Sequence, residues 1–215
     1  MKLLKRLKTQ DPADNELIVM DSNSIDSSSD TATMDRDFAE VPGFLGRIDR
    51  WDVVILTWLS RRPWRLLRGL ATLVSRTGDG HLYAIIVIAV LFSRPAGGVE
   101  FLVAGLIAVA IELPIYFFLK RQVRRARPKD DKGWIRTRSG PLDQFSFPSG
   151  HTAAACLSAT LLATFFPFFA PWAFAWAALV GMSRLLLMVH FPSDILAGAT
   201  LGVVAATLSL SLLPF

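Results

Sequence analysis

Three short polar motifs interrupt the apolar sequence between residues 120 and 194, and these residues decide the fold. In chain order the motifs are Lys120-Arg121-Gln122-Val123-Arg124-Arg125-Ala126-Arg127-Pro128, Pro148-Ser149-Gly150-His151, and Ser183-Arg184 followed by His190 and Asp194. Their spacing reads K-x6-R-P, P-S-G-H and S-R-x5-H-x3-D. Because each motif adjoins an apolar segment, the stretch predicts an all-α bundle of membrane helices with a polar site at the bilayer interface.

Five residues of these motifs are candidates for binding a phosphoryl group. Such a group carries charge on its equatorial oxygens during transfer, so a site without a metal needs several fixed donors. The cations are Lys120, Arg127 and Arg184, and the Ser149 hydroxyl and Gly150 amide add neutral donors. Gly150 also lets the backbone approach an oxyanion closely, and a helix beginning there would favour an anion.

Two histidines suit a two-step displacement, in which one attacks phosphorus and the other protonates the departing alkoxide. Asp194 follows His190 by four residues, which places both on one helical face if a helix has begun there. A carboxylate in that place can hold the imidazole in one tautomer. We therefore predict His190 as nucleophile, Asp194 as its orienting partner, and His151 as general acid and later as base on water.

Together and in this order, the motifs resemble the signature of the type 2 phosphatidic acid phosphatase (PAP2) superfamily, and the sequence is similar to its small bacterial integral-membrane members. The resemblance covers roughly the C-terminal half of the chain. It implies hydrolysis of a lipid phosphate through a phosphohistidine intermediate, with neither metal nor cofactor and with the same roles for the two histidines. The alternative is a non-catalytic lipid-phosphate binder or transporter that keeps the anion pocket.

The composition is that of a small membrane protein. Of the 215 residues, 52% are apolar, and the net charge is +5. Nine acidic residues and one basic residue fall between Asp11 and Glu40, so the rest of the chain carries +13. This basic body predicts anionic membrane lipids and a phosphorylated lipid as partners. No soluble basic domain or recognition motif indicates nucleic acid.

The chain divides into three predicted parts. Residues 1–42 are a basic N-terminus followed by an acidic, serine-rich tail that we expect to be disordered. Residues 43–77 are amphipathic, and Arg61-Arg62-Pro63 should divide them into two interfacial helices, although one distorted spanning helix is an alternative. Residues 78–215 form the membrane-embedded phosphatase domain.

Five apolar segments of this domain are predicted to span the membrane, and residues 44–76 would add a sixth span if they crossed it. The five are residues 81–93, 99–119, 151–166, 172–189 and 193–213. Gly78-Asp79-Gly80 is expected to be a turn before the first. Glu112, inside the second, should face the protein interior, either in a structural pair or in a substrate role. Cys156 is expected to serve packing.

Because successive spans alternate direction, all three motifs should lie on one face of the membrane. With five spans, the basic N-terminal region shares that face, and the positive-inside rule predicts the cytoplasmic side of a bacterial inner membrane. A sixth span would move the site to the outer side. The polar loop between Lys120 and Phe147 could cap the site. The sequence does not rank phosphatidic acid, phosphatidylglycerophosphate, lipid A or polyprenyl phosphates as substrates, and it leaves the oligomeric state open.

Overall fold

The computed structural model describes residues 44–61, 65–128 and 145–213, and the regular elements in these ranges are helices. They are α2 (Phe44–Ser60), α3 (Arg65–Thr77), α4 (His81–Ser93), α5 (Gly98–Val123), α6 (Gly150–Phe165), the 3-10 helix η2 (Pro167–Phe169), α7 (Ala170–Leu186) and α8 (Pro192–Ser211). The predicted all-α class is confirmed. The predicted disordered tail and the central part of the predicted capping loop lie outside the described residues.

Two helices, α2 and α3, occupy residues 44–60 and 65–77, and the predicted location of these helices at the membrane interface remains a prediction. Helix α2 ends at Ser60 and α3 begins at Arg65, on either side of Pro63. Proline lacks a backbone N–H and restricts the residue before it, so a helix boundary is expected there. The predicted turn at residues 78–80 joins α3 to α4, and the axes of these two helices differ by 45° across it.

The protein is a membrane protein by the length and composition of its helices. Within the described ranges, three helical segments are long and apolar enough to cross a bilayer: Gly98–Val123, Pro167–Leu186 and Pro192–Ser211. The bent pair α3–α4 would add a fourth if it forms one span, and α6 is apolar but shorter. The count of five to six spans therefore remains a prediction.

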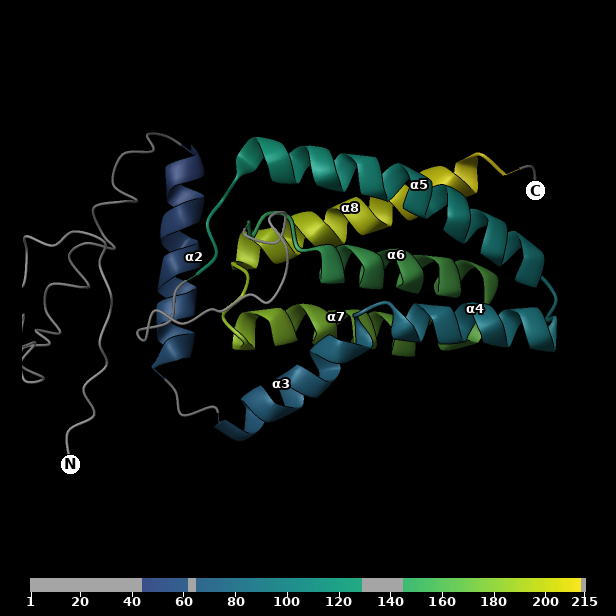
Figure 1. Cartoon of the computed structure of the whole chain (residues 1–215), viewed down its shortest axis with the longest axis horizontal. Helices are drawn as coiled ribbons and strands as arrows, with labels where there is room; N and C mark the ends of the chain where they lie inside the picture. The colour runs from purple at the N-terminus through teal and green to yellow at the C-terminus, as the bar shows by residue number, and fades with distance from the viewer. Residues whose placement is uncertain (1–43, 62–64, 129–144, 214–215) are drawn as a thin grey trace, which may run out of the picture. The chain divides into compact units, whose positions relative to one another are not determined.

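Helices α5, α6, α7 and α8 run side by side, and α2 crosses the end of this bundle (Figure 1). Helix α6 packs against both α7 and α8, and α5 packs against α8. The core between them is rich in alanine, including Ala104 and Ala108 of α5 and Ala205 and Ala206 of α8. Glu112 of α5 is only 5% exposed, so its predicted inward orientation is confirmed.

Two glycines of α8 let that helix lie directly on the backbone of α6. A Cβ atom added to Gly198 would lie 2.3 Å from the carbonyl oxygen of Ser149, and one added to Gly202 would lie 2.1 Å from that of Ala153. Small residues allow helix backbones to approach closely in membranes. The contact at Gly198 matters for function, because it sets the start of α6 against the start of α8.

Substituting Gly202 by alanine should destabilise the protein, because the new methyl group overlaps the backbone of Ala153. Overpacking of this kind costs roughly 1–3 kcal/mol. The measurement is the melting temperature in detergent, with Gly69→Ala as the matched control. A Cβ at Gly69 of α3 meets nothing within 4 Å, so that substitution should be neutral or slightly stabilising. Equal melting temperatures for both variants would contradict the close helix contact.

Candidate active site

The three motifs meet at one end of the bundle. Lys120 lies in the last turn of α5, Gly150 begins α6, Arg184 lies in the last turn of α7, and His190 occupies the connection to α8. Backbone hydrogen bonds join the motifs directly. The amide of Ser149 donates to the Asp194 carbonyl at 3.0 Å, and the amide of Ser146 donates to the Arg125 carbonyl at 2.8 Å. Segments far apart in sequence therefore form one site.

His190 is held by a backbone carbonyl. Its side chain is 3% exposed, and Nδ1 donates to the carbonyl oxygen of Ser146 at 2.7 Å. The nearest approach to the Asp194 carboxylate is 3.8 Å, from Nδ1 to Oδ2. Because α8 begins at Pro192, His190 lies outside the helix, and the expected shared helical face does not form. Asp194 instead accepts from the Phe191 amide at 2.8 Å and acts on His190 as a nearby charge.

This environment keeps His190 neutral. Burial, together with the guanidinium groups of Arg184 and Arg127, lowers the pKa of His190 to about 4, although Asp194 partly opposes this shift. A carbonyl only accepts hydrogen bonds, so the single hydrogen of the neutral ring lies on Nδ1. Nε2 therefore carries a lone pair, which is what a nucleophile at phosphorus requires.

The stability of the protein should depend on pH through His190. The folded-state pKa is about 4 and the ordinary value is 6.5, so between these values the unfolded chain binds a proton that the folded protein excludes. The free energy of unfolding should fall as the pH falls through this window, by up to about 3 kcal/mol. As the pH is lowered through this window, we expect the melting temperature of the wild type to drop more steeply than that of His190→Asn. The exposed His81→Asn should behave like the wild type, and parallel curves for all three proteins would contradict the buried neutral histidine.

Lys120 and Gly150 are linked through one tyrosine. The Lys120 ammonium donates to Tyr116 Oη at 2.6 Å and lies 4.9 Å from the centre of the same ring. An added Cβ at Gly150 would lie 3.1–3.2 Å from the Tyr116 ring. The sequence interpretation gave Gly150 the task of approaching an oxyanion. The structure adds a packing reason, because any larger residue would displace the tyrosine that holds Lys120.

The remaining anion-binding candidates lie around the same end. Arg127 and Arg184 are half-buried, and both charges act on His190. Arg184 Nη1 also donates to Ser75 Oγ at 2.5 Å. Ser149 is fully buried, and its hydroxyl pairs with that of Thr152 at 2.9 Å. The predicted donor is therefore at the site but engaged with a neighbour in this state.

Arg125 is a central residue that the sequence interpretation did not single out. Its guanidinium contacts three carboxylates: Asp49 and Asp52 of α2 at 2.6 and 2.7 Å, and Asp194 of α8 at 2.8 Å. It also donates to Ser193 Oγ at 2.7 Å. Asp52 in turn accepts from both the amide and the hydroxyl of Ser193. The cluster ties α2 to the start of α8. Basic residues fill most of its motif, so its sequence carried no signal that one of them is buried.

A second carboxylate that sequence reasoning missed is Asp79, in the break between α3 and α4. Its Oδ1 lies 2.5 Å from His151 Nε2. The available signal was an acidic residue between two glycines, immediately before an apolar segment. The turn was predicted correctly, but its proximity to the second motif depends on the bend between the two helices.

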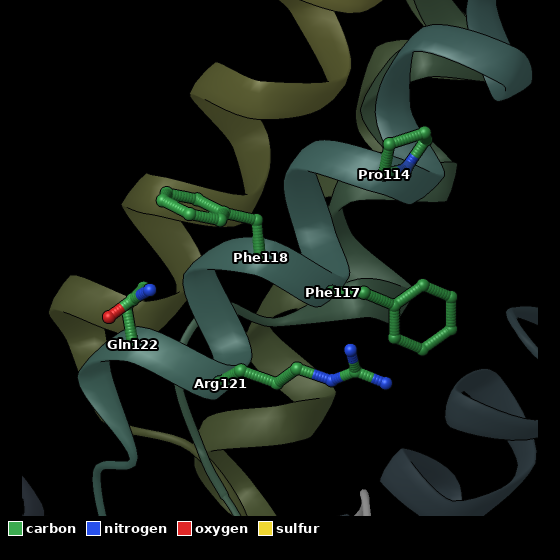
Figure 2. Close-up of a pocket in the computed structure, with 5 residues that line it drawn as sticks. All are labelled: Pro114, Phe117, Phe118, Arg121 and Gln122. Carbon is green, nitrogen blue, oxygen red and sulfur yellow. The ribbon is translucent and has the colours of Figure 1, made fainter.

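A groove on the outer surface of α5 lies beside the site but is lined by none of the motif's predicted functional residues. Figure 2 shows Phe117 and Arg121 projecting to one side of the helix and Phe118 and Gln122 to the other, with Pro114 one turn above. Phe118 is 61% exposed, as expected of a side chain that faces lipid. This groove is therefore separate from the predicted catalytic residues, which lie at the helix ends.

A buried neutral histidine, a second histidine and several cations therefore lie together at one end of the membrane helix bundle. Residues 97–215 match the model of the PAP2 superfamily. The chain belongs to this superfamily and is a phosphatase of its lipid-phosphate class. The recognition of the family from its three motifs is confirmed.

Relatives of known activity share this assignment. The chain is 34% identical to the decaprenylphosphoryl-5-phosphoribose phosphatase of Mycobacterium tuberculosis over 156 residues, which cover 70% of this chain and 81% of the relative. It is 36% identical to the lipid A 1-phosphatase of Rhizobium etli over 88 residues, covering 39% of this chain and 38% of that protein.

Two solved structures have the same fold. The structure of Aquifex aeolicus LpxE aligns with a TM-score of 0.59 at 25% identity, covering 74% of this chain and 94% of that one. A transmembrane PAP2-type phosphatidylglycerolphosphate phosphatase from Bacillus subtilis aligns with a TM-score of 0.59 at 26% identity, covering 86% of this chain and 94% of that one.

Proposed function

We propose that the protein hydrolyses a lipid phosphate without a metal, through a phosphohistidine formed on His190. The observation that carries this proposal is the buried His190 ring, whose Nδ1 donates to the Ser146 carbonyl while two arginine charges act on it. That arrangement leaves Nε2 to attack phosphorus. It also surrounds the place where the phosphoryl oxygens would lie with positive charge.

In the first step, His190 Nε2 forms a bond to phosphorus, and the bond from phosphorus to the lipid oxygen breaks. The electron pair of that bond goes to the oxygen, which takes a proton from His151. In the second step His151 removes a proton from water, the water oxygen attacks phosphorus, and the N–P bond electrons return to His190. Lys120, Arg127 and Arg184, with the Ser149 hydroxyl and the Gly150 amide, hold the phosphoryl oxygens.

For the substrate we propose a polyprenyl-linked phosphate ester, and a sugar phosphate carried on such a lipid is the first to test. The support is the mycobacterial relative, which aligns over most of both chains and is named for a decaprenyl-linked phosphoribose. A site at the helix ends can take a polar headgroup while the prenyl chain stays in the bilayer. Phospholipid and lipid A phosphates form the comparison set.

We further propose that residues 78–215 form the phosphatase domain of a multi-pass protein with five spans in a bacterial inner membrane, which places the site on the cytoplasmic face. A sixth span formed by residues 44–76 would place the site on the outer face instead. Basic residues are abundant at the site end, whereas the opposite end carries Arg94 in the connection between α4 and α5 and Glu100 in the first turn of α5. Lys and Arg concentrate on the cytoplasmic side of membrane proteins. The orientation can be tested with two single-cysteine variants, Arg121→Cys at the site end and Ala96→Cys at the opposite end, each in a Cys156→Ser background. An impermeant thiol reagent added outside the cell should label only the variant at residue 96 if the site is cytoplasmic.

The experiment for activity is phosphate release by detergent-purified protein in EDTA, across a panel of polyprenyl, phospholipid and lipid A phosphates. We expect release that vanadate inhibits and that added magnesium or zinc does not increase. Activity that appears only after metal is added would contradict the metal-free mechanism. A folded protein that binds vanadate but releases no phosphate from any lipid would instead support the lipid-phosphate binder.

A further inference from the structure

The break between α3 and α4 and the last turn of α3 before it reach two residues of the site, although neither belongs to the three motifs. Asp79 Oδ1 lies 2.5 Å from His151 Nε2, and Ser75 Oγ accepts a hydrogen bond of 2.5 Å from Arg184 Nη1. His151 and Arg184 have chemical roles in the proposed function. The break and the helical turn before it therefore contact both the proton donor and an anion-binding cation.

The backbone of the break holds Asp79 in place. The Gly78 amide donates to the Ser75 carbonyl at 3.0 Å, and the Asp79 amide donates to the Arg76 carbonyl at 3.1 Å. Gly80, the next residue, has a φ of 86°, a conformation that side chains other than glycine rarely adopt. Two backbone hydrogen bonds therefore fix the conformation of the chain up to Asp79, and the positive φ of Gly80 sets its direction after Asp79.

Side-chain contacts hold the same turn against α6 and α7. Trp176 of α7 donates to Thr77 Oγ1 at 2.9 Å. An added Cβ at Gly78 would lie 3.2 Å from His151 Cδ2 and 3.3 Å from Val180 Cγ1, so the turn lies in contact with the histidine ring. These contacts fix the distance between the Asp79 carboxylate and the ring.

We propose that Asp79 is a positioning residue for the general acid His151. A carboxylate only accepts hydrogen bonds, so the hydrogen of the 2.5 Å contact lies on His151 Nε2. With Nε2 engaged in this way, Nδ1 is the ring nitrogen that exchanges a proton with the substrate. This inference rests on the proposed function, because it assigns an atom to the proton transfer that the function requires.

The proton steps balance with Asp79 as a constant acceptor. The imidazolium of His151 gives its Nδ1 proton to the departing lipid oxygen and keeps the Nε2 hydrogen on Asp79. Neutral His151 then takes a proton from the attacking water at Nδ1, which restores the imidazolium. The Asp79 carboxylate stays ionised throughout and stabilises the charged ring before the first step and after the second.

The pair lies at the mouth of the site. The His151 side chain is 29% exposed and that of Asp79 is 45% exposed, so water screens part of their attraction. Arg184 of α7 lies against the same region, because its Nη1 donates to Ser75 Oγ. In the described part of the chain, the Asp79 carboxylate contacts His151 directly through Nε2. Its removal should therefore weaken the acid and leave the nucleophile intact.

The test compares two leaving groups in Asp79→Asn and Asp79→Ala. A lipid alkoxide leaves only with a proton, whereas the p-nitrophenolate of p-nitrophenyl phosphate needs little protonation. General acid catalysis contributes roughly 100- to 10,000-fold, so losing the orienting partner should lower kcat on the lipid phosphate by roughly 10- to 100-fold. On p-nitrophenyl phosphate the loss should be much smaller. Glu100→Gln, an exposed carboxylate at the opposite end of α5, is the matched control and should equal the wild type on both substrates.

A second readout is the pH profile of kcat on the lipid phosphate. Without the carboxylate the imidazolium is less stable, so the alkaline limb should move to lower pH in Asp79→Asn and return toward its original place in Asp79→Glu. Equal losses on both leaving groups, an unmoved alkaline limb, or full activity of Asp79→Ala would each overturn the inference. An active wild type with unaffected variants would overturn it alone, whereas a wild type inactive on every lipid phosphate would overturn the proposed function as well.

Discussion

Replacing His190 by alanine is expected to lower phosphate release from a lipid substrate by at least about 10,000-fold. The side chain is buried, its Nδ1 hydrogen is engaged by the Ser146 carbonyl, and the ring is neutral because its pKa lies near 4. No other described histidine has this combination of burial and tautomer. Residual hydrolysis would have to come from direct attack of water on a phosphate held by the surrounding cations.

The covalent intermediate offers the sharpest measurement. With p-nitrophenyl phosphate, His151→Ala should still form the phosphohistidine, because the leaving group needs little protonation. It should hydrolyse that intermediate slowly, because no base activates the water. We therefore expect acid-labile, alkali-stable phosphate to accumulate on His151→Ala and to be absent from the His190→Ala, His151→Ala double variant.

Two controls separate chemistry from folding in this experiment. His190→Ala should still show the cooperative thermal unfolding of a folded protein at neutral pH. It should also still bind vanadate. His81→Ala changes an exposed histidine at the start of α4 and should retain full turnover. Substantial turnover by His190→Ala, or labelled phosphate on a residue that this variant retains, would remove His190 as the nucleophile.

The helices could be predicted from the sequence because polar residues bound each apolar segment. The predicted limits of 81–93 and 193–213 match α4 and α8 to within a few residues. The fourth predicted segment, 172–189, continues past the end of its helix, since α7 ends at Leu186. The amides of Leu187, Met188 and Val189 turn back onto carbonyls of the last turn, and Met188 adopts a φ of 57°. Hydropathy cannot report this reversal, because these residues are as apolar as the helix.

The site residues could also be predicted, but several of their contacts could not. The partner of the His190 ring is a backbone carbonyl 44 residues away, and every residue type has one. A motif identifies side chains whose chemistry is specific, so it finds His190 and Arg184. It does not find Ser146, whose contribution depends only on where the backbone passes.

Burial of charged residues was the second feature that sequence could not settle. The run before Pro128 contains Lys120, Arg121, Arg124, Arg125 and Arg127. In the structure Arg121 and Arg124 are exposed, whereas Arg125 is 14% exposed and contacts carboxylates of two other helices. The run leaves the helix after Val123, so helical periodicity no longer predicts which side chains point inward.

Substituting Arg125 by alanine should cause the largest loss of stability among single changes at the site. The substitution leaves Asp52 and Asp194 with 4% and 0% of their side chains exposed and without the cation that they share. Removing one partner of a buried ion pair typically costs roughly 3–5 kcal/mol. For a chain of this size that corresponds to a fall in melting temperature of roughly 10 °C. Arg121→Ala, an exposed change in the same region, should leave the melting temperature near that of the wild type.

The same change should also reduce catalysis, because the cluster sets the start of α8. Arg125 Nη1 donates to Asp194 Oδ1, and the Asp194 carbonyl accepts from the Ser149 amide that opens α6. Loss of the guanidinium should therefore make the contact between the start of α6 and the start of α8 less rigid, and the two histidine motifs meet at this contact. Arg125→Lys keeps the charge but not the fork that reaches α2 and α8 together, so it should recover only part of the stability.

A double-mutant cycle separates charge from packing. If the cost of Arg125→Ala arises from uncompensated carboxylates, Asp52→Asn should destabilise the wild type but destabilise the Arg125→Ala protein less, or even stabilise it. If the two changes add, the guanidinium serves packing, for which the Phe191 ring 4.0 Å from its central carbon is the partner. A melting temperature of Arg125→Ala equal to that of the wild type would remove the cluster as the link between α2 and the catalytic end of the bundle.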